Sequence, residues 1–303
     1  MLHSESHASP RVRPAVAKRV GADGHAVSGS EAVPADREFE WSSADFDRVQ
    51  SLIYKRAGIS LNDGKHAMVY SRLSRRLRET GHRSFREYLS WLESHDGDEW
   101  QEFINALTTN LTSFFRENHH FEILHEHLQS KPKGQRWNIW CSAASTGEEP
   151  YSIVMTAMEA LGGAGGFHLT ASDIDSKVLA TAARGVYKLE NMKGLEPEKL
   201  RRFFFRGKGA NSGMVRVKPE LQSVVEFLQV NLIEDGWPFR EPFDIVFCRN
   251  VMIYFDAPTQ RGVLERIHRN MKPGGLLFVG HSENFNDSRD LFTLRGKTVY
   301  ERR

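Results

Sequence analysis

Residues 137–161 read WNIWCSAASTGEEPYSIVMTAMEAL. The run WNIWC is typical of a buried strand, and Tyr151 to Leu161 of a helix, because apolar residues recur there at helical spacing. The same strand, loop and helix order recurs at Phe167 to Ala183, and another strand is predicted at Phe243 to Cys248. Leu276 to Gly280 is apolar at every position, as expected for a strand buried on both faces. This alternation predicts an α/β fold with a doubly wound parallel sheet.

One segment, at about residues 186–222, interrupts the alternation. It holds Gly207, Gly209 and Gly213 beside the short run Met214 to Val217, a combination that predicts a hairpin. We interpret it as a small β subdomain inserted into the α/β domain.

The α/β domain is predicted to span residues 126–303. After the insertion, the apolar run Val224 to Val230 supplies the next strand of the main sheet. Thr293 to Tyr300 alternates less cleanly and is interpreted as an antiparallel edge strand.

Upstream, residues 38–125 show helical patterns and are predicted to form a small all-helical domain. Ser42 or Ser43 can cap its first helix, which ends at Gly58, and the second helix stops at Gly81. Residues 117–129 are interpreted as a connecting helix. Residues 1–37 lack the apolar content needed to offset ordering entropy, so we predict a disordered tail there.

Composition limits the functions that the chain can have. Its 303 residues carry 41 basic and 39 acidic side chains, a formal charge of +2, which argues against non-specific nucleic-acid binding. No run of about 18 apolar residues and no signal-like N-terminus is present, so we expect a cytoplasmic protein without membrane insertion. Cys141 and Cys248 cannot build a disulfide framework and lack zinc-site spacing; we expect reduced thiols and no metal.

Polar side chains follow four predicted strands, where open α/β sheets bind ligands. Glu148 or Glu149 follows the first strand, although acidic residues also favour a helix start. Asp173 and Asp175 follow the second, where one can bind a ribose and the other can cap a helix. Together these strand ends predict a nucleoside-like ligand, with further polar candidates at Asn231, Arg249 and Asn250.

Arg116 lies in the stretch from Thr109 to Glu117, which also contains Phe114 and Phe115. A guanidinium held by aromatic packing can bind a carboxylate through two parallel hydrogen bonds. The alternative is a surface salt bridge with a nearby acid.

Five motifs carry a resemblance to a known family. With family-like order and spacing, the chain resembles the chemotaxis receptor glutamate O-methyltransferases, the CheR family, from about Phe39 to Tyr300. The motifs are Thr109 to Glu117, Ala143 to Ser152, Ala171 to Asp175, Phe247 to Phe255 and Gly280 to Glu283.

The resemblance implies a Rossmann-like S-adenosylmethionine-binding domain with an inserted β subdomain, preceded by a helical domain. It implies methyl transfer from S-adenosylmethionine to glutamate carboxylates of chemoreceptors, with S-adenosylhomocysteine as the product and a monomeric enzyme. Alternatives are a non-catalytic S-adenosylmethionine sensor and a methyltransferase for another carboxylate or for RNA. By resemblance, the cofactor contacts are Asn110, Thr112, Arg116, Glu149, Asp173, Asn231, Leu232, Asn250 and Val251.

Specific roles also follow from the resemblance. Arg116 would bind the methionine carboxylate, Glu149 a polar group of the cofactor, and Asp173 the ribose. Glu148 remains a rival to Glu149. No general base is required, because a glutamate with a pKa of about 4.3 is already ionised at neutral pH.

Two segments are candidates for receptor binding. Seven basic residues and two acidic ones lie between Asp63 and Arg86, and helical spacing places Arg72, Arg75 and Arg78 away from Leu73 and Leu77. This cationic face is predicted to dock on an acidic receptor bundle; a solvated helix face or nucleic-acid binding are the alternatives.

The second segment is the β insertion. In similar family members it binds a receptor's C-terminal peptide by strand addition. Here the residues implied are Gly207, Gly209, Gly213 and Arg216, although the glycines could also serve only as hairpin turns.

Overall fold

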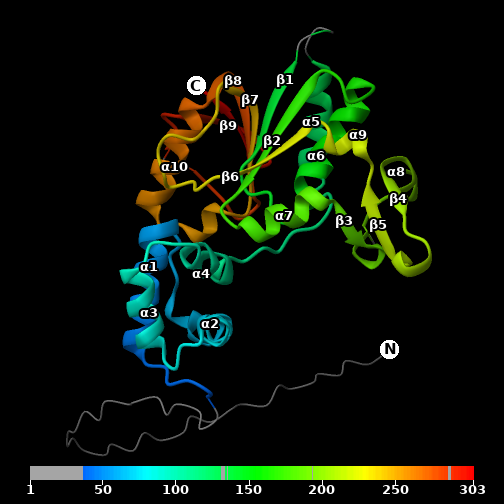
Figure 1. Ribbon diagram of the computed structural model, residues 1–303. Helices are drawn as coiled ribbons and strands as arrows, with labels where there is room; N and C mark the ends of the chain where they lie inside the picture. The colour runs from blue at the N-terminus through cyan, green and yellow to red at the C-terminus, as the bar shows by residue number, and fades with distance from the viewer. Residues whose placement is uncertain (1–36, 131–133, 135, 193, 286–287) are drawn as a thin grey trace, which may run out of the picture. The chain divides into compact units, whose positions relative to one another are not determined.

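The computed structural model describes residues 37–130, 134, 136–192, 194–285 and 288–303. The predicted tail, residues 1–37, lies outside the described residues except for Arg37. Figure 1 shows the elements in chain order, from the first helices in blue to the last strands in red.

The first two helices begin and end where their terminal residues predict. In α1 (Ser43–Ala57), Ser42 and Asp45 form a reciprocal capping box, and Gly58 ends the helix with φ 70°. α2 (His66–Thr80) follows the 3₁₀ turn η1 (Asp63–Lys65) and ends at Gly81 with φ 76°. A left-handed C-cap without a Cβ is unstrained.

Two further helices complete the helical region, which we define as α1 to α4. They are α3 (Phe85–Ser94) and α4 (Glu99–Leu107), as the amphipathic pattern predicts. Their apolar faces join those of α1 and α2 in one core, whose fully buried side chains include Phe46, Val49, Leu73, Leu77, Phe85, Tyr88 and Phe103.

The main sheet has seven strands in the order β6-β2-β1-β7-β8-β10-β9. Its strands β6, β2, β1, β7 and β8 are parallel, so the predicted doubly wound sheet is confirmed. The strand order reverses at β1 and β7, which start the two halves. The strands are β1 (Trp137–Cys141), β2 (Phe167–Asp173), β6 (Val225–Gln229), β7 (Phe243–Cys248), β8 (Met271–Val279), β9 (Phe292–Gly296) and β10 (Val299–Arg302).

The C-terminal edge differs from the prediction of one strand. β9 and β10 form an antiparallel hairpin, and β10 pairs antiparallel with β8. Lys297 and Thr298 make the reversal with φ 49° and 58°. Both residues are unusual in left-handed backbone, which is why their sequence gave no turn signal.

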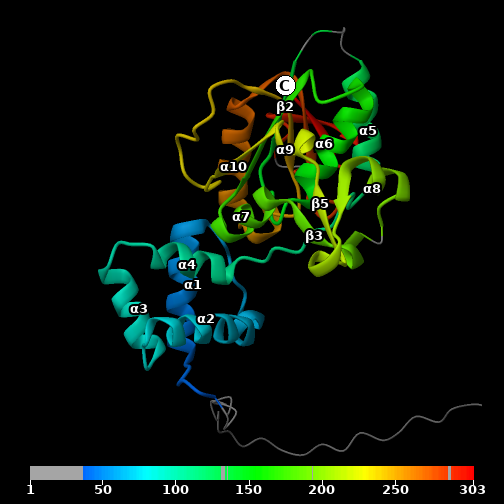
Figure 2. The same cartoon turned by 45° about the vertical axis from the view of Figure 1, so that its right-hand side comes forward.

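Helices cover both faces of the main sheet, as Figures 1 and 2 show. α6 (Glu148–Leu161) packs with the cluster that contains Ile139 and Phe247, whereas α10 (Ala257–Arg269) packs with Trp140 and Val246. Successive strand residues therefore point to opposite cores, as a sheet buried on both faces requires. Cys141 and Cys248, on neighbouring strands, are buried and unbridged.

The predicted connecting helix is α5 (His119–Gln129), and it is part of the sheet's core. Phe121, Leu124 and Leu128 pack with α6 and β1. The boundary drawn between residues 125 and 126 therefore falls inside a helix that packs on the sheet, because its apolar face needs that cover.

The insertion forms a separate antiparallel sheet in the order β3-β5-β4. The predicted hairpin is formed by β4 and β5, with Phe204 opposite Val217. The insertion consists of β3 (Val186–Lys188), η2 (Leu189–Met192), α8 (Pro197–Phe203), β4 (Phe204–Arg206), η3 (Gly209–Asn211), β5 (Met214–Val217) and α9 (Pro219–Gln222), and it follows α7 (Ser176–Arg184), which packs on β2 and β6. No helix in the described part of the chain has the length and apolar character of a membrane span.

Candidate functional site

A pocket opens at the carboxyl ends of β1, β2, β6 and β7, beside the point where the strand order reverses. It contains about 1140 Å³, including space open to solvent. The helical region lines its other side through Ile59, Ser60 and Met68. All nine residues implied as cofactor contacts line this pocket: Asn110, Thr112, Arg116, Glu149, Asp173, Asn231, Leu232, Asn250 and Val251.

The loop after β1 forms the floor beside α6. Gly147 starts the helix with φ 100°, and a Cβ there would lie 2.6 Å from the Tyr187 hydroxyl. Only glycine fits both this backbone and this approach. Ser145, also left-handed at φ 48°, donates its backbone N–H to Asp173 over 2.8 Å.

The two aspartates after β2 have different positions. Asp175 caps α7 by accepting from the backbone of Lys177 and Val178. Asp173 lines the pocket and is 9% exposed. Burial raises its pKa to about 6, although backbone N–H groups of Asp175 and Ser145 oppose the shift. Asp175 is thus the residue that caps the helix, whereas Asp173 lines the pocket.

The two adjacent glutamates also separate. Glu149 is buried and lines the pocket, whereas Glu148 lies outside it and accepts from the Thr146 hydroxyl over 2.6 Å. Burial raises the pKa of Glu149, and the charge of Arg249 opposes that rise. Glu149 is therefore the acid that a ligand can reach.

Arg249 is a site residue that the cofactor assignment missed. Its guanidinium, fully buried, lies 2.5 Å from Glu149 Oε2 and 3.3 Å from Glu117 Oε2, and donates to the Arg116 carbonyl over 2.5 Å. One cation thus ties the loop after β7 to α6 and to the Arg116 segment. An arginine directly after a wholly buried strand was the available sequence signal.

Glu283 is the second missed residue. Its carboxylate accepts backbone N–H groups from Gly280, Asn250, Val251 and Met252 over 2.5 to 3.0 Å. It thereby fixes a turn in which Asn250 has φ 57°. A Cβ on Gly280 would lie 2.4 Å from Asn250 Nδ2, so the two segments need glycine to meet.

The segment carrying Arg116 has an irregular backbone. Phe115 and Glu117 have φ 53° and 58°, and Arg116 donates to the Leu111 carbonyl over 3.0 Å. Phe114 is buried beside Tyr187 and Phe204 and belongs to the core on the α6 face of the sheet. Left-handed residues of this kind collect at binding sites, where surrounding contacts hold them.

Direct contacts join the helical region to the sheet at the pocket. Asn231 donates to the Arg56 carbonyl over 2.8 Å, and the Tyr54 hydroxyl to Asp256 over 2.9 Å. Gly58 lies against the loop that follows β6, and a Cβ on Gly58 would be only 2.5 Å from Ile233 Cγ2 in that loop. The ligand space is therefore bounded by both parts of the chain.

The predicted cationic face needs one correction. Arg72 is half-buried and donates to carbonyls at the C-terminus of α4, including Thr108 over 2.6 Å and Leu107 over 3.2 Å. Its charge complements the negative end of that helix. Arg75 and Arg78 are exposed, with side chains 77% and 55% accessible.

In the insertion, the glycines have local roles. A Cβ on Gly207 would lie 2.0 Å from the Asn211 carbonyl, and Gly209 and Gly213 have φ 57° and 83°. Arg216 is exposed on the central strand β5. The tight β4–β5 connection therefore explains all three glycines without a ligand.

The side chains around the pocket fit a nucleoside that carries amino-acid groups. Asp173 offers a carboxylate for ribose hydroxyls and Glu149 one for an amino group, while Arg116 can pair with a carboxylate. A pocket of this kind at the switch point of a doubly wound sheet defines a Rossmann-like nucleoside-binding protein.

Comparison with known proteins narrows this class. The family description "CheR methyltransferase, SAM binding domain" matches residues 110–301, and "CheR methyltransferase, all-alpha domain" matches residues 44–108. The chain thus belongs to the CheR family of chemotaxis methyltransferases, and S-adenosylmethionine is its cofactor.

Three curated relatives share this assignment over most of their length. A chemotaxis protein methyltransferase of Klebsiella aerogenes is 53% identical over 276 residues, covering 90% of this chain and 94% of the relative. The chemotaxis protein methyltransferase of Escherichia coli is 53% identical over 262 residues, covering 86% of this chain and 91% of the relative. Chemotaxis protein methyltransferase 2 of Pseudomonas aeruginosa is 48% identical over 267 residues, covering 88% of this chain and 95% of the relative.

Proposed function

We propose that this methyltransferase acts on glutamate side chains of chemoreceptors and forms methyl esters. The observation that supports this most directly is the family match over a pocket whose nine implied cofactor contacts come together. A glutamate acceptor is ionised at neutral pH, so it can attack without a proton acceptor in the protein.

Within the pocket, the roles proposed for individual residues rest on their chemistry. Arg116 would hold the methionine carboxylate, Glu149 the amino group, and Asp173 the ribose hydroxyls. When bound, the cofactor supplies its methyl carbon to the acceptor's carboxylate oxygen, and the S–C electron pair stays on sulfur in S-adenosylhomocysteine. The protein's part is to align donor and acceptor, which can contribute about 7 to 11 kcal/mol.

A partly closed pocket favours this reaction. The donor sulfonium and the acceptor carboxylate lose opposite charges together, so water would stabilise the separated ions more than the transition state. Residues of the helical region line one side of the pocket and reduce its access to water. This closure is a reason for the helical region to contact the strand ends.

The acceptor is tested by following a labelled methyl group. Transfer to receptor cytoplasmic fragments, with release as methanol in mild base, is the expected result, because esters hydrolyse there. Base-stable label would indicate an N-methyl product, such as methylated RNA, and the absence of transfer to any acceptor would leave a binding protein.

We expect Asp173→Ala to weaken S-adenosylhomocysteine binding by about 1 to 3 kcal/mol, through loss of charged hydrogen bonds. Burial raises the pKa of the Asp173 carboxyl to about 6. Wild-type affinity should therefore fall as the pH is lowered through that value, because a protonated Asp173 accepts hydrogen bonds from the ligand less well. Calorimetry between pH 5 and 8 measures both effects. A folded variant with wild-type affinity would remove Asp173 from the site.

Receptor docking is proposed for the exposed arginines of α2. Arg75 and Arg78 keep the accessibility that steering toward an acidic bundle requires, although Arg75 pairs with Glu79 and Arg78 lies 3.7 Å from a Glu38 carboxylate oxygen. We expect Arg75→Glu with Arg78→Glu to slow receptor methylation severalfold at low salt, and the difference from wild type to shrink as salt rises. Cofactor affinity should not change. Normal receptor methylation at low salt would make this face a solvated surface.

For the C-terminal peptide, the edge strand β4 is the proposed binding element. Phe205 on this strand is 54% exposed, and a peptide strand could pair along the edge away from β5. A receptor lacking its last residues should then be methylated more slowly, with the effect of the α2 arginines retained. Equal rates for both receptors would contradict a tether.

A further inference from the structure

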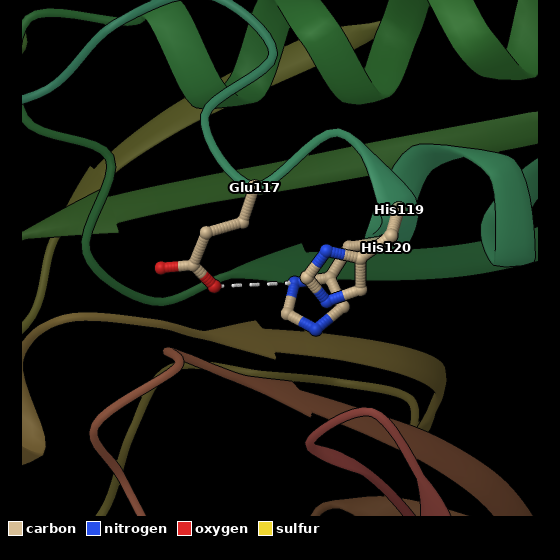
Figure 3. Close-up of side chains that lie close together, drawn as sticks. All are labelled: Glu117, His119 and His120. Carbon is tan, nitrogen blue, oxygen red and sulfur yellow. Dashed lines mark ion pairs between the residues drawn. The ribbon is translucent and has the colours of Figure 1, made fainter. Parts of the chain in front are cut away.

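Three potential metal ligands lie together at the start of α5. Figure 3 shows the Glu117 carboxylate facing the imidazole rings of His119 and His120. One ligand atom from each lies within 4.8 Å of the others, and Glu117 Oε2 is 3.7 Å from His120 Nδ1. None of the cofactor roles proposed above uses either histidine.

The hydrogen bonds of His120 determine which of its nitrogens carries the proton. Nε2 lies 2.9 Å from the Lys297 carbonyl oxygen, which can only accept, so Nε2 must be the protonated nitrogen. In the neutral ring, Nδ1 then carries no proton and presents a lone pair. It has no hydrogen-bond partner among the described residues, and the side chain is fully buried. A buried acceptor in this state requires a donor or a cation.

The atom that faces this lone pair is also an acceptor. Glu117 Oε2 is buried and makes no hydrogen bond in the described part of the chain, although Arg249 lies 3.3 Å from it. Arg249 also pairs with Glu149, so one guanidinium serves two carboxylates, of which Glu149 is buried and Glu117 is partly exposed. Two buried acceptor atoms therefore face each other with no hydrogen-bond donor between them among the described residues, an arrangement that a bound cation would satisfy.

We propose that Glu117, His119 and His120 form a binding site for a divalent transition metal, of which Zn²⁺ fits the donor set best. Two imidazoles and one carboxylate are borderline ligands that suit Zn²⁺. Ligand atoms bound to one tetrahedral zinc are about 3.3 Å apart, so the observed 3.7 Å needs an adjustment of only a few tenths of an ångström.

The surroundings of His120 match those of metal-bound histidines. Such histidines donate their second N–H to a backbone carbonyl or carboxylate, which fixes the ring and its tautomer, and the Lys297 carbonyl serves this purpose here. His119 is half-exposed as the first residue of α5, so its ring can rotate the remaining distance toward the other two ligands. The same exposure gives the ion a path from solvent.

The test uses the full-length chain and Zn²⁺ alone, with calorimetry after removal of chelators. We expect one tight Zn²⁺ per chain, with affinity at least tenfold weaker in His119→Gln and in His120→Gln. His125→Gln, on the same helix but outside the cluster, is the matched control and should bind as wild type does. Co²⁺ in place of Zn²⁺ should give the visible spectrum of a four-coordinate ion.

Folding defects and adventitious binding are separated by the same set of variants. His119→Gln changes a half-exposed side chain, so it should retain S-adenosylhomocysteine binding and still lose Zn²⁺, even if His120→Gln folds poorly. Wild-type Zn²⁺ affinity in both cluster variants would overturn the proposal and indicate a buried water between the two acceptors. An equal loss in His125→Gln would also overturn it, because binding would then involve other histidines.

Discussion

Replacing Arg249 by Met should lower the free energy of unfolding by about 3 to 5 kcal/mol, the usual cost of removing one partner of a buried ion pair. The long apolar side chain of Met preserves much of the packing, but Glu149 and Glu117 would lose their shared cation. The Arg116 carbonyl would lose a donor as well. Urea denaturation at pH 7 measures the difference.

The pH dependence of this variant identifies the cause. Burial already raises the pKa of Glu149, and without Arg249 the folded-state pKa should rise further above the unfolded value. Ionisation then favours the unfolded chain at neutral pH, and this penalty disappears as the pH falls toward and below the ordinary glutamate value. The deficit relative to wild type should therefore shrink in acid. A deficit independent of pH would point to lost packing, and Arg75→Met, at an exposed position, should leave stability unchanged.

The second large effect is expected for Glu283→Gln. Each carboxylate oxygen accepts two backbone N–H groups, whereas the amide places an NH₂ group against one of those pairs. Loss of two charge-assisted hydrogen bonds, at about 1.5 kcal/mol or more each, should lower the free energy of unfolding by about 3 kcal/mol. Because Asn250 and Val251 line the pocket, affinity for S-adenosylhomocysteine should fall at least tenfold.

Calorimetry and urea denaturation on the same protein separate the two consequences. Glu190→Gln is a suitable control, since this exposed acid pairs only with a surface lysine in the structure described. If Glu283→Gln retained wild-type affinity in its folded fraction, the turn at Asn250 would not depend on the carboxylate, and Glu283 would serve stability alone.

The sequence predicts best those features that depend on neighbouring residues. The capping box at Ser42, the terminal Gly58 and the apolar strands are local signals, and the structure contains each of them. The parallel order also follows, because alternating strands and helices allow few other arrangements. The polar residues after the strands meet because the carboxyl ends of parallel strands lie at one edge.

What the sequence could not provide depends on contacts between distant segments. Periodicity places Arg72 on the polar side of α2, but it cannot show that carbonyls of α4 lie within reach. Glu283 accepts from backbone groups 31 to 33 positions away, besides that of nearby Gly280, and Arg249 donates to a carbonyl 133 positions away, so no local pattern reveals their roles. Likewise, the sequence of α5 predicts only a connecting helix, because it does not show that the main sheet covers the helix's apolar face.

The close approach at Gly58 limits how this enzyme can be recombined. Two family descriptions divide the chain at residues 108 and 110, as if its parts were interchangeable modules. Yet a side chain at position 58 would collide with Ile233, and the Arg56 carbonyl is bound by Asn231. A chimera that imports another helical region would retain its cofactor only if the incoming first helix also ended in glycine against that loop. We therefore expect the end of the first helix and the loop after β6 to change together in evolution.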